Sequence, residues 1–125
     1  MSGGWLALVV GVAGGLGAVC RYLADGAVGD RTSGVFPFGT LTVNAVGSLV
    51  LGIVTGLVLH HGVPPEWRLT VGVGFCGGLT TWSTASFETV RLAEEGALGH
   101  ALSYALAGLV VSCAAGAVGL GLALI

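Results

Sequence analysis

The stretch GVGFCGGLTTWSTASFE, residues 72–88, decides how this chain folds. It lies almost wholly in a run without charged residues, 69–87, and about 20 helical residues are enough to cross a bilayer core. Within this run, the pair Gly77–Gly78 is followed by five hydroxyl residues in the seven positions 80–86. Glycine pairs weaken helices, and hydroxyl groups can bond the backbone groups that a break sets free. We therefore expect a third transmembrane helix that is broken at mid-membrane, near residues 76–81.

Such a break has two interpretations. Its freed carbonyl oxygens can bind a cation, and its freed N–H groups or hydroxyls can bind an anion. The alternative is a simple kink without a ligand. Non-helical backbone at this depth is tolerated only inside protein or beside a cavity, so we expect the break to be enclosed.

Composition extends this interpretation to the whole chain. The 125 residues include four arginines, no lysine and six acidic residues, so 8% are charged, whereas 54% are hydrophobic and 24 are glycine. An ordinary soluble domain has about 25% charged residues. Small soluble domains need a charged shell because they are mostly surface, and nucleic-acid binding needs a basic face. Both classes are excluded, and we expect an integral membrane protein with no nucleic-acid partner.

The uncharged stretches set the number of spans. Each of four stretches is long enough for a membrane helix, and 125 residues leave no room for an extramembrane domain. The predicted fold is a single all-α membrane domain over residues 1–125, with transmembrane helices near 4–24, 36–60, 67–93 and 98–124. A polar turn is expected over 25–35, and Pro64 and Pro65 are expected to separate the second helix from the third.

The arginines bias the orientation only weakly. Arg31 and Arg91 lie beside the first and third connections, with Arg21 nearby, whereas Arg68 lies on the other side. This is a small positive-inside signal. The chain either has one orientation set by that small bias or inserts both ways and pairs with itself antiparallel.

Polar and small residues recur at helical spacing. The polar positions fall into two sets spaced in fours, Thr40, Asn44 and Ser48 in the second span and His100, Tyr104 and Ser112 in the fourth. They either line a narrow path or form hydrogen bonds between helices. The small positions form three GxxxG pairs that favour close helix packing: Gly11/Gly15, Gly52/Gly56 and Gly74/Gly78.

The remaining reactive side chains do not suggest catalysis. We find no carboxylate in mid-span, which argues against a proton-coupled transporter or a cation pathway. Glu88 and Arg91, three residues apart, are interpreted as a local ion pair. The cysteines, Cys20, Cys76 and Cys113, are expected to be buried apolar residues. With no nucleophile–base pair and no metal motif, the chain is not expected to be an enzyme.

Three motifs resemble those of the bacterial fluoride channel family, Fluc or CrcB. Residues 14–22, GGLGAVCRY, resemble the family's opening motif, and residues 39–48, GTLTVNAVGS, resemble its GTLxxNxxGS segment. Residues 74–81, GFCGGLTT, resemble the start of its GFCGGxTTFSTFSxE signature, which Ser83, Thr84, Ser86 and Glu88 continue. The resemblance covers the whole chain.

The resemblance implies a function and an assembly. Members of the family form antiparallel, dual-topology dimers with two narrow pores. They lie in the cell membrane, which is the inner membrane in cells that have two membranes. They give passive fluoride efflux, which lowers cytoplasmic fluoride. A structural sodium ion, which is not transported, sits at the subunit interface on backbone carbonyls that fall on Gly77 and Thr80 here. With the polar spacing, the predicted pore lining is Thr40, Asn44, Ser48, Trp82, Ser83, Thr84, Tyr104 and Ser112.

This lining suits a small anion that holds its water tightly. A pore must replace the hydration shell with hydrogen-bond donors rather than with a buried full charge. The Asn44 amide and the hydroxyl groups are donors of this kind, and the weakly positive edges of aromatic rings can also face an anion.

The chain departs from the family at three pore positions. The two phenylalanines of the signature are replaced by Trp82 and Ala85, and the first serine of the last helix by Gly108. Either a homodimer still conducts, or the chain is half of a heterodimer with a second family member and has little activity alone, or it does not conduct. More distant alternatives are a small four-helix exporter, which would need a glutamate in its first helix, and a purely structural membrane subunit.

Overall fold

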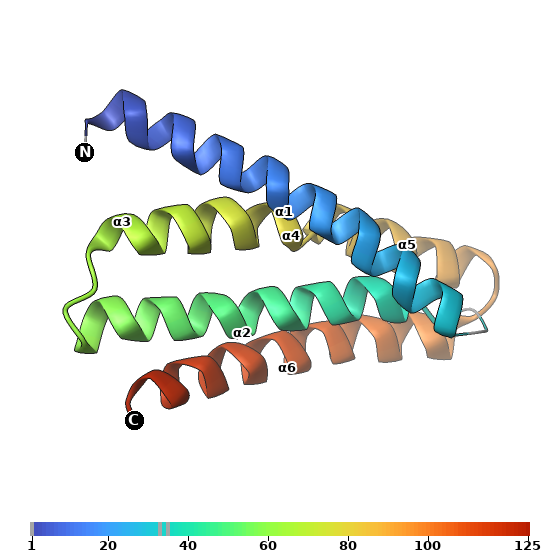
Figure 1. Ribbon diagram of the computed structural model, residues 1–125. Coiled ribbons are helices and arrows are strands. Elements are labelled where there is room, and N and C mark those ends of the chain that lie inside the picture. The colour runs from blue at the N-terminus through green and yellow to red at the C-terminus, as the bar shows by residue number, and fades with distance from the viewer. Residues whose placement is uncertain (1, 33, 35) are drawn as a thin grey trace.

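The computed structural model describes residues 2–32, 34 and 36–125 (Figure 1), and these residues form helices and no strand. The helices follow one another as α1 (Gly3–Arg31), α2 (Phe38–His60), α3 (Pro65–Trp67), the π-helix η1 (Arg68–Cys76), α4 (Gly77–Leu79), α5 (Trp82–Glu94) and α6 (Leu98–Ala123). The expectation of an all-helical chain is therefore confirmed.

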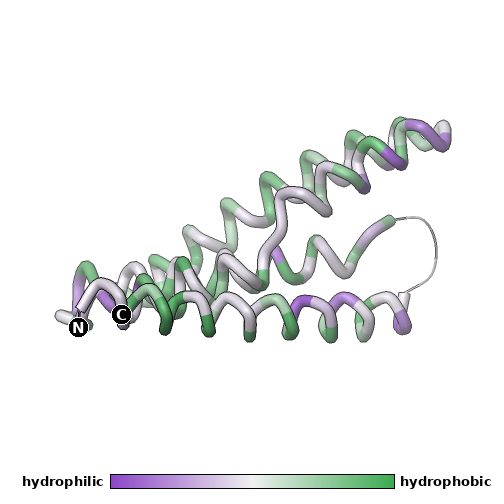
Figure 2. The backbone as a smooth tube through the Cα atoms, turned by 90° about the horizontal axis from the view of Figure 1, so that it is seen from above, coloured by the Kyte–Doolittle hydropathy of each residue, from purple (hydrophilic) through white to green (hydrophobic). Residues whose placement is uncertain are grey.

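Three helices, α1, α2 and α6, are long and apolar enough to cross a membrane. Figure 2 shows apolar residues along much of the length of the helices, with hydrophilic residues between them and at several helix ends. Many of them are exposed on the outer faces; in α1, Leu8, Val12 and Leu16 are each more than half exposed. An apolar outer surface of this extent faces lipid or another apolar surface. The chain is a multi-pass integral membrane protein.

The segment from α3 to α5 runs beside α2 as an interrupted path. It starts after Pro64, at the His60 end of α2, and finishes at Glu94, near the opposite end of the molecule (Figure 1). The backbone is helical through Gly77, with φ −63° and ψ −37°, and extended at Thr80 and Thr81, with ψ 161° and 123°. The interruption thus falls at Thr80–Thr81, at the end of the predicted range 76–81, and not at the glycine pair.

The first helix is longer than predicted. Its predicted end was residue 24, but α1 continues to Arg31, and the expected polar turn is wrong for residues 25–31. Polar residues alone do not end a helix, because a helix that emerges into water keeps its backbone bonds while its side chains are solvated. Ser33 and Val35, which complete the expected turn, lie outside the described residues.

Glycines allow the helices to approach closely. A Cβ on Gly52 would overlap the carbonyl of Gly116, and one on Gly78 would overlap the carbonyl of Gly14, so α2 packs on α6 and α4 packs on α1 backbone to backbone. The Gly52/Gly56 and Gly74/Gly78 pairs both lie at such contacts. The Gly11/Gly15 pair does not, since a Cβ at either position would meet nothing within 4 Å.

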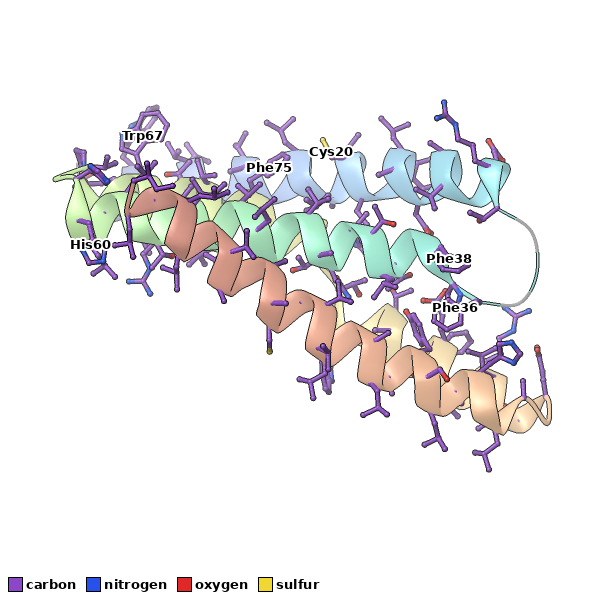
Figure 3. The ribbon with its side chains drawn as sticks, turned by 90° about the horizontal axis from the view of Figure 1, so that it is seen from below. Cys20, Phe36, Phe38, His60, Trp67 and Phe75 are labelled. Atoms are coloured by element: carbon purple, nitrogen blue, oxygen red, sulfur yellow. The ribbon has the colours of Figure 1, made fainter. Side chains whose placement is uncertain are left out.

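The two ends of the molecule are held differently. At one end, Nε2 of the His61 ring donates to the Ala123 carbonyl, and this hydrogen bond joins α2 to α6. At the other end, Phe36 and Phe38 pack with ring centroids 4.8 Å apart, and Figure 3 shows them opposite the end that carries Trp67. The interruption of the α3–α5 path lies between these ends.

Candidate functional site

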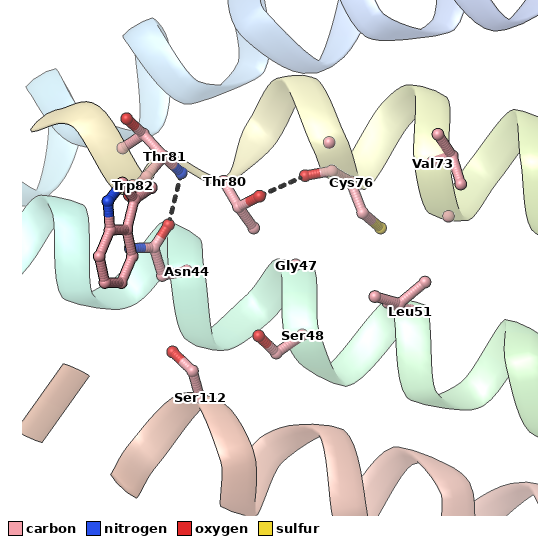
Figure 4. Close-up of a pocket in the computed structure, with 12 residues that line it drawn as sticks. Asn44, Gly47, Ser48, Leu51, Val73, Cys76, Thr80, Thr81, Trp82 and Ser112 are labelled. Carbon is pink, nitrogen blue, oxygen red and sulfur yellow. Dashed lines mark hydrogen bonds between the residues drawn. The ribbon is translucent and has the colours of Figure 1, made fainter. Parts of the chain in front are cut away.

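Asn44 holds the extended backbone of the interruption. Its Nδ2 donates to the Thr81 carbonyl at 3.1 Å, and the Thr81 N–H donates to its Oδ1 at 2.7 Å (Figure 4). Both atoms of one side-chain amide therefore bond one residue of the neighbouring segment. Without Asn44, the extended backbone would leave the N–H and the carbonyl of Thr81 without partners, at a cost of roughly several kcal/mol in hydrocarbon.

The interruption also redirects the hydrogen bonds of its neighbours. Thr80 donates to the Cys76 carbonyl through both its N–H and its hydroxyl, at 2.9 and 2.8 Å. Thr81 Oγ1 caps α5 by accepting from the Thr84 N–H at 3.0 Å.

The carbonyl groups of residues 77–80 lose their helical partners as a result, and for two of them the diverted donor can be named. In a continuous helix the Thr81 N–H would donate to Gly77 and the Thr84 N–H to Thr80. The first donates to Asn44 and the second to the Thr81 hydroxyl. The carbonyls of Gly77 and Thr80, the two that the resemblance assigns to sodium, are thus among those set free.

Two uncharged, mostly apolar grooves meet at the interruption. One, of about 460 Å³, includes Ser48, Gly77 and Thr80, and the other, of about 550 Å³, includes Ala85, Tyr104 and Gly108. The residues common to both are Asn44, Thr81, Trp82 and Ser112. None of the lining residues of either groove carries a formal charge. The grooves therefore offer neutral donors along one continuous surface.

Glu88 forms a second polar cluster deeper in the helix bundle. Its Oε1 accepts from Thr40 Oγ1 at 2.7 Å and from the Tyr104 hydroxyl at 3.0 Å. Thr40 and Tyr104 are each only 2% exposed. The ring of Phe36 packs edge to face on Tyr104, with centroids 5.4 Å apart and planes at 89°. Two residues predicted to line a pore thus donate to a carboxylate that the sequence analysis placed elsewhere.

The predicted ion pair between Glu88 and Arg91 is wrong. Arg91 Nε instead contacts Glu95 Oε1 at 3.0 Å on the exposed side of α5. Helical spacing explains the difference, because Glu88 shares its face with the buried Leu92, four residues on, whereas Arg91 does not. Leu92, one helical turn after Glu88, was the signal in the sequence that pointed inward, whereas Phe87 and Val90 are exposed.

The other predicted positions fall in different places. Thr84 lines a smaller cavity of about 200 Å³ together with Thr40 and Arg21, whose Nε atom is buried without a partner in the described part of the chain. Ser83 and His100 are exposed and lie outside both grooves. The structure therefore brings together Asn44, Ser48, Trp82 and Ser112 but separates them from Ser83.

Fold and site together define an integral membrane protein with uncharged, donor-bearing grooves around an interrupted helix. Residues 8–120 match the family model described as CrcB-like protein, Camphor Resistance (CrcB), and the chain belongs to this family.

Relatives with curated names cover most of the chain. The chain is similar to fluoride-specific ion channel FluC 1 of Leifsonia xyli, 53% identical over 92% of this chain and 82% of the relative. It is also similar to FluC 1 of Frankia casuarinae, 47% identical over 96% and 94%, and to FluC 2 of Cutibacterium acnes, 46% identical over 84% and 89%.

Proposed function

We propose that this chain forms a fluoride channel that gives passive fluoride efflux. The observation that carries the proposal is the pair of uncharged, donor-bearing grooves that meet at the Asn44–Thr81 contact. The relatives' names supply the identity of the ion, and the chemistry of the grooves suits it.

Neutral donors are the groups that fluoride requires. A fixed positive charge would hold the ion too tightly for rapid release, whereas several weaker donors can replace its water in turn. The hydroxyls of Ser48 and Ser112 make no hydrogen bond within the described residues and are free to donate. Those of Thr40 and Tyr104 are engaged by Glu88 in this conformation, so the free donors lie along the grooves.

The membrane arrangement is part of the proposal. The interrupted path from α3 to α5 makes a fourth crossing, and two copies pair antiparallel in the membrane. The fourth crossing is supported by the length of this path beside α2. The antiparallel pair is supported by the weak arginine bias and by the groove lined by Gly77 and Trp82, which lies on the outside of the single chain.

The same proposal includes a structural sodium ion. Hard cations prefer oxygen ligands, and half-helix ends with unwound carbonyls are a recurrent way of binding sodium in membranes. The carbonyls of Gly77 and Thr80 fit this role because their helical hydrogen bonds are diverted. One chain supplies two such oxygens, so a second copy would complete the shell.

One observation favours a second candidate, a heterodimer subunit with little activity alone. Ala85 offers no aromatic edge and Gly108 no hydroxyl to the larger groove. The relatives' names also carry the numerals 1 and 2. In this case a second family member would supply the missing groups.

Efflux from liposomes separates the two candidates. The purified chain is reconstituted alone, with sodium present, and fluoride release is followed with an electrode, with chloride release as the control. Fast, fluoride-selective release supports the homodimeric channel. No release from a folded, dimeric sample would overturn it, and co-expression with a second family member would then test the heterodimer.

A further inference from the structure

A third cavity carries the formal charges that the two grooves lack. This charged cavity has a volume of about 200 Å³, and its lining includes Arg21, Asp25 and Thr81. Thr81 also lines both grooves, so the three spaces meet at one residue. An ion in the charged cavity therefore lies next to the uncharged donors of the grooves.

Arg21 is the positive charge of this cavity. Its Nε atom is buried and has no hydrogen-bond partner in the described part of the chain. No carboxylate of the described residues lies within salt-bridge distance of its guanidinium group. The hydroxyl groups of Thr81 and Thr84 line the same space. An unpaired guanidinium beside hydroxyl groups favours a small anion, because all of these groups can donate hydrogen bonds to it.

Asp25 is the negative charge of the same cavity. It follows Arg21 by four residues in α1, so the two side chains leave the helix on one face. A Cβ on Gly39 would overlap Asp25 Oδ1, which places the carboxylate against the first turn of α2.

The first turn of α2 explains why the Asp25 carboxylate stays there. This turn, which the structure describes in full, has no acidic residue and no side-chain cap of its own. A carboxylate is favoured at such a helix N-terminus. Asp25 is therefore held beside α2, where it lowers the positive potential of Arg21 without pairing with it.

Glu88 is the next charge, and it lies behind the wall of the cavity. Thr40 lines the charged cavity and donates to Glu88 Oε1 at 2.7 Å, whereas Glu88 itself does not line it. Of the lining residues, Arg21 and Asp25 are the charged ones, and their formal charges cancel.

We infer that Asp25 offsets the charge of Arg21 and so limits how tightly the charged cavity holds fluoride on its way to the grooves. The inference rests on the proposed function and names a residue that sets the affinity for the ion beside the grooves. An unopposed guanidinium would retain the anion, and an unopposed carboxylate would repel it. With both present the anion can enter and leave, as conduction requires.

Charge-neutralising variants test the inference in liposomes at low ionic strength. Asp25→Asn should lower the fluoride concentration for half-maximal efflux by about threefold, and lower the maximal rate, because Arg21 is then unopposed. Arg21→Gln should raise that concentration. The double variant, again without net charge, should return most of the way to the native value. Asp30→Asn is the matched control, because Asp30 lies on the same helix, is exposed and is outside the cavity.

Salt separates an electrostatic role of Asp25 from a structural one. The shift in Asp25→Asn should shrink as salt is added, because ions screen charges. Asp25→Glu keeps the charge and should behave like the native chain. An unchanged half-maximal concentration in Asp25→Asn, or a double variant no closer to the native value than Arg21→Gln, overturns the inference.

Thiol reactivity measures the same charge balance without fluoride movement. Tyr22 is 78% exposed and lines the charged cavity. Full-length chains with Tyr22→Cys, and with the three native cysteines replaced by alanine, are treated with an anionic and a cationic methanethiosulfonate reagent. Adding Asp25→Asn should raise the ratio of anionic to cationic reaction rates by about threefold, whereas adding Asp30→Asn should leave it unchanged. Equal ratios in both variants, or no reaction with either reagent, overturn the inference.

The two experiments also separate this inference from the proposed function. A native chain that releases no fluoride overturns the self-sufficient channel, while the thiol ratio still reports whether Asp25 offsets Arg21. Native efflux with an unchanged half-maximal concentration and an unchanged thiol ratio leaves the channel intact and removes the role of Asp25.

Discussion

Asn44 on α2 and Thr81 in the interrupted segment exchange two hydrogen bonds, of 3.1 and 2.7 Å. This pairing fixes where the helix breaks, because it supplies the partners that Thr81 would lose outside a helix. By diverting the Thr81 N–H, it also releases the Gly77 carbonyl. One side chain thus links the two uncharged grooves to the proposed cation site.

Replacing Asn44 should therefore destabilise the chain and impair efflux together. Asn44→Ala leaves the Thr81 N–H and carbonyl unpaired, at about 1–3 kcal/mol for each group. Thermal unfolding in detergent and efflux from liposomes measure the two effects. Thr42→Val is the matched control, since Thr42 lies on the same helix, is exposed and bonds only the Phe38 carbonyl. Equal unfolding temperatures for the two variants would contradict a stabilising role for the two Asn44–Thr81 hydrogen bonds.

Glu88 should matter as an acceptor rather than as an ion-pair partner. Glu88→Gln keeps an oxygen for Thr40 and Tyr104 and should unfold near the native temperature, whereas Glu88→Leu leaves both buried hydroxyls unpaired, at about 1–3 kcal/mol each. Arg91→Gln is the control and should change little, because the Arg91–Glu95 pair is exposed. A loss of stability in Arg91→Gln as large as that in Glu88→Leu would instead support the ion pair between Glu88 and Arg91.

Adjacent glycines should respond differently to one added methyl group. Gly78→Ala places a Cβ against the carbonyl of Gly14 and 3.1 Å from the Ala18 nitrogen, so it should force α1 away from α4 and cost about 1–3 kcal/mol. Gly77→Ala meets nothing within 4 Å in the single chain and should leave its unfolding unchanged. The unfolding temperatures of the two variants are the measurement. A similar decrease in both would refute the close contact between Gly78 and α1.

Sodium should stabilise the assembled protein. The thermal unfolding temperature should be higher in sodium chloride than in choline chloride at equal ionic strength, because a ligand at 100 times its Kd adds about 2.7 kcal/mol to the folded state. Thr80→Val is the control, since it removes a hydroxyl but keeps the backbone carbonyl, and the sodium effect should persist in it. No difference between the two salts for the native chain would refute a sodium site at these carbonyls.

The sequence predicted the interruption but not its exact place. Gly77 and Gly78 are weak helix formers, yet both remain helical, because Gly78 is needed for contact with α1 and the hydrogen bonds that favour a break are available only at Thr81. Asn44 was identified as a site residue from its spacing. Its partner, 37 positions further along the chain, could not be found in this way, since no local pattern links the two.

Membrane class and helical architecture were determined by the sequence itself, because charge is too scarce for a water-exposed surface and apolar runs of this length must lie in lipid. The tertiary structure decided which polar groups meet: Glu88 with Thr40 and Tyr104, and Asn44 with Thr81. The physical reason is that composition and period act on single helices, whereas a hydrogen bond between helices depends on their relative rotation and depth. Close packing at glycines sets both.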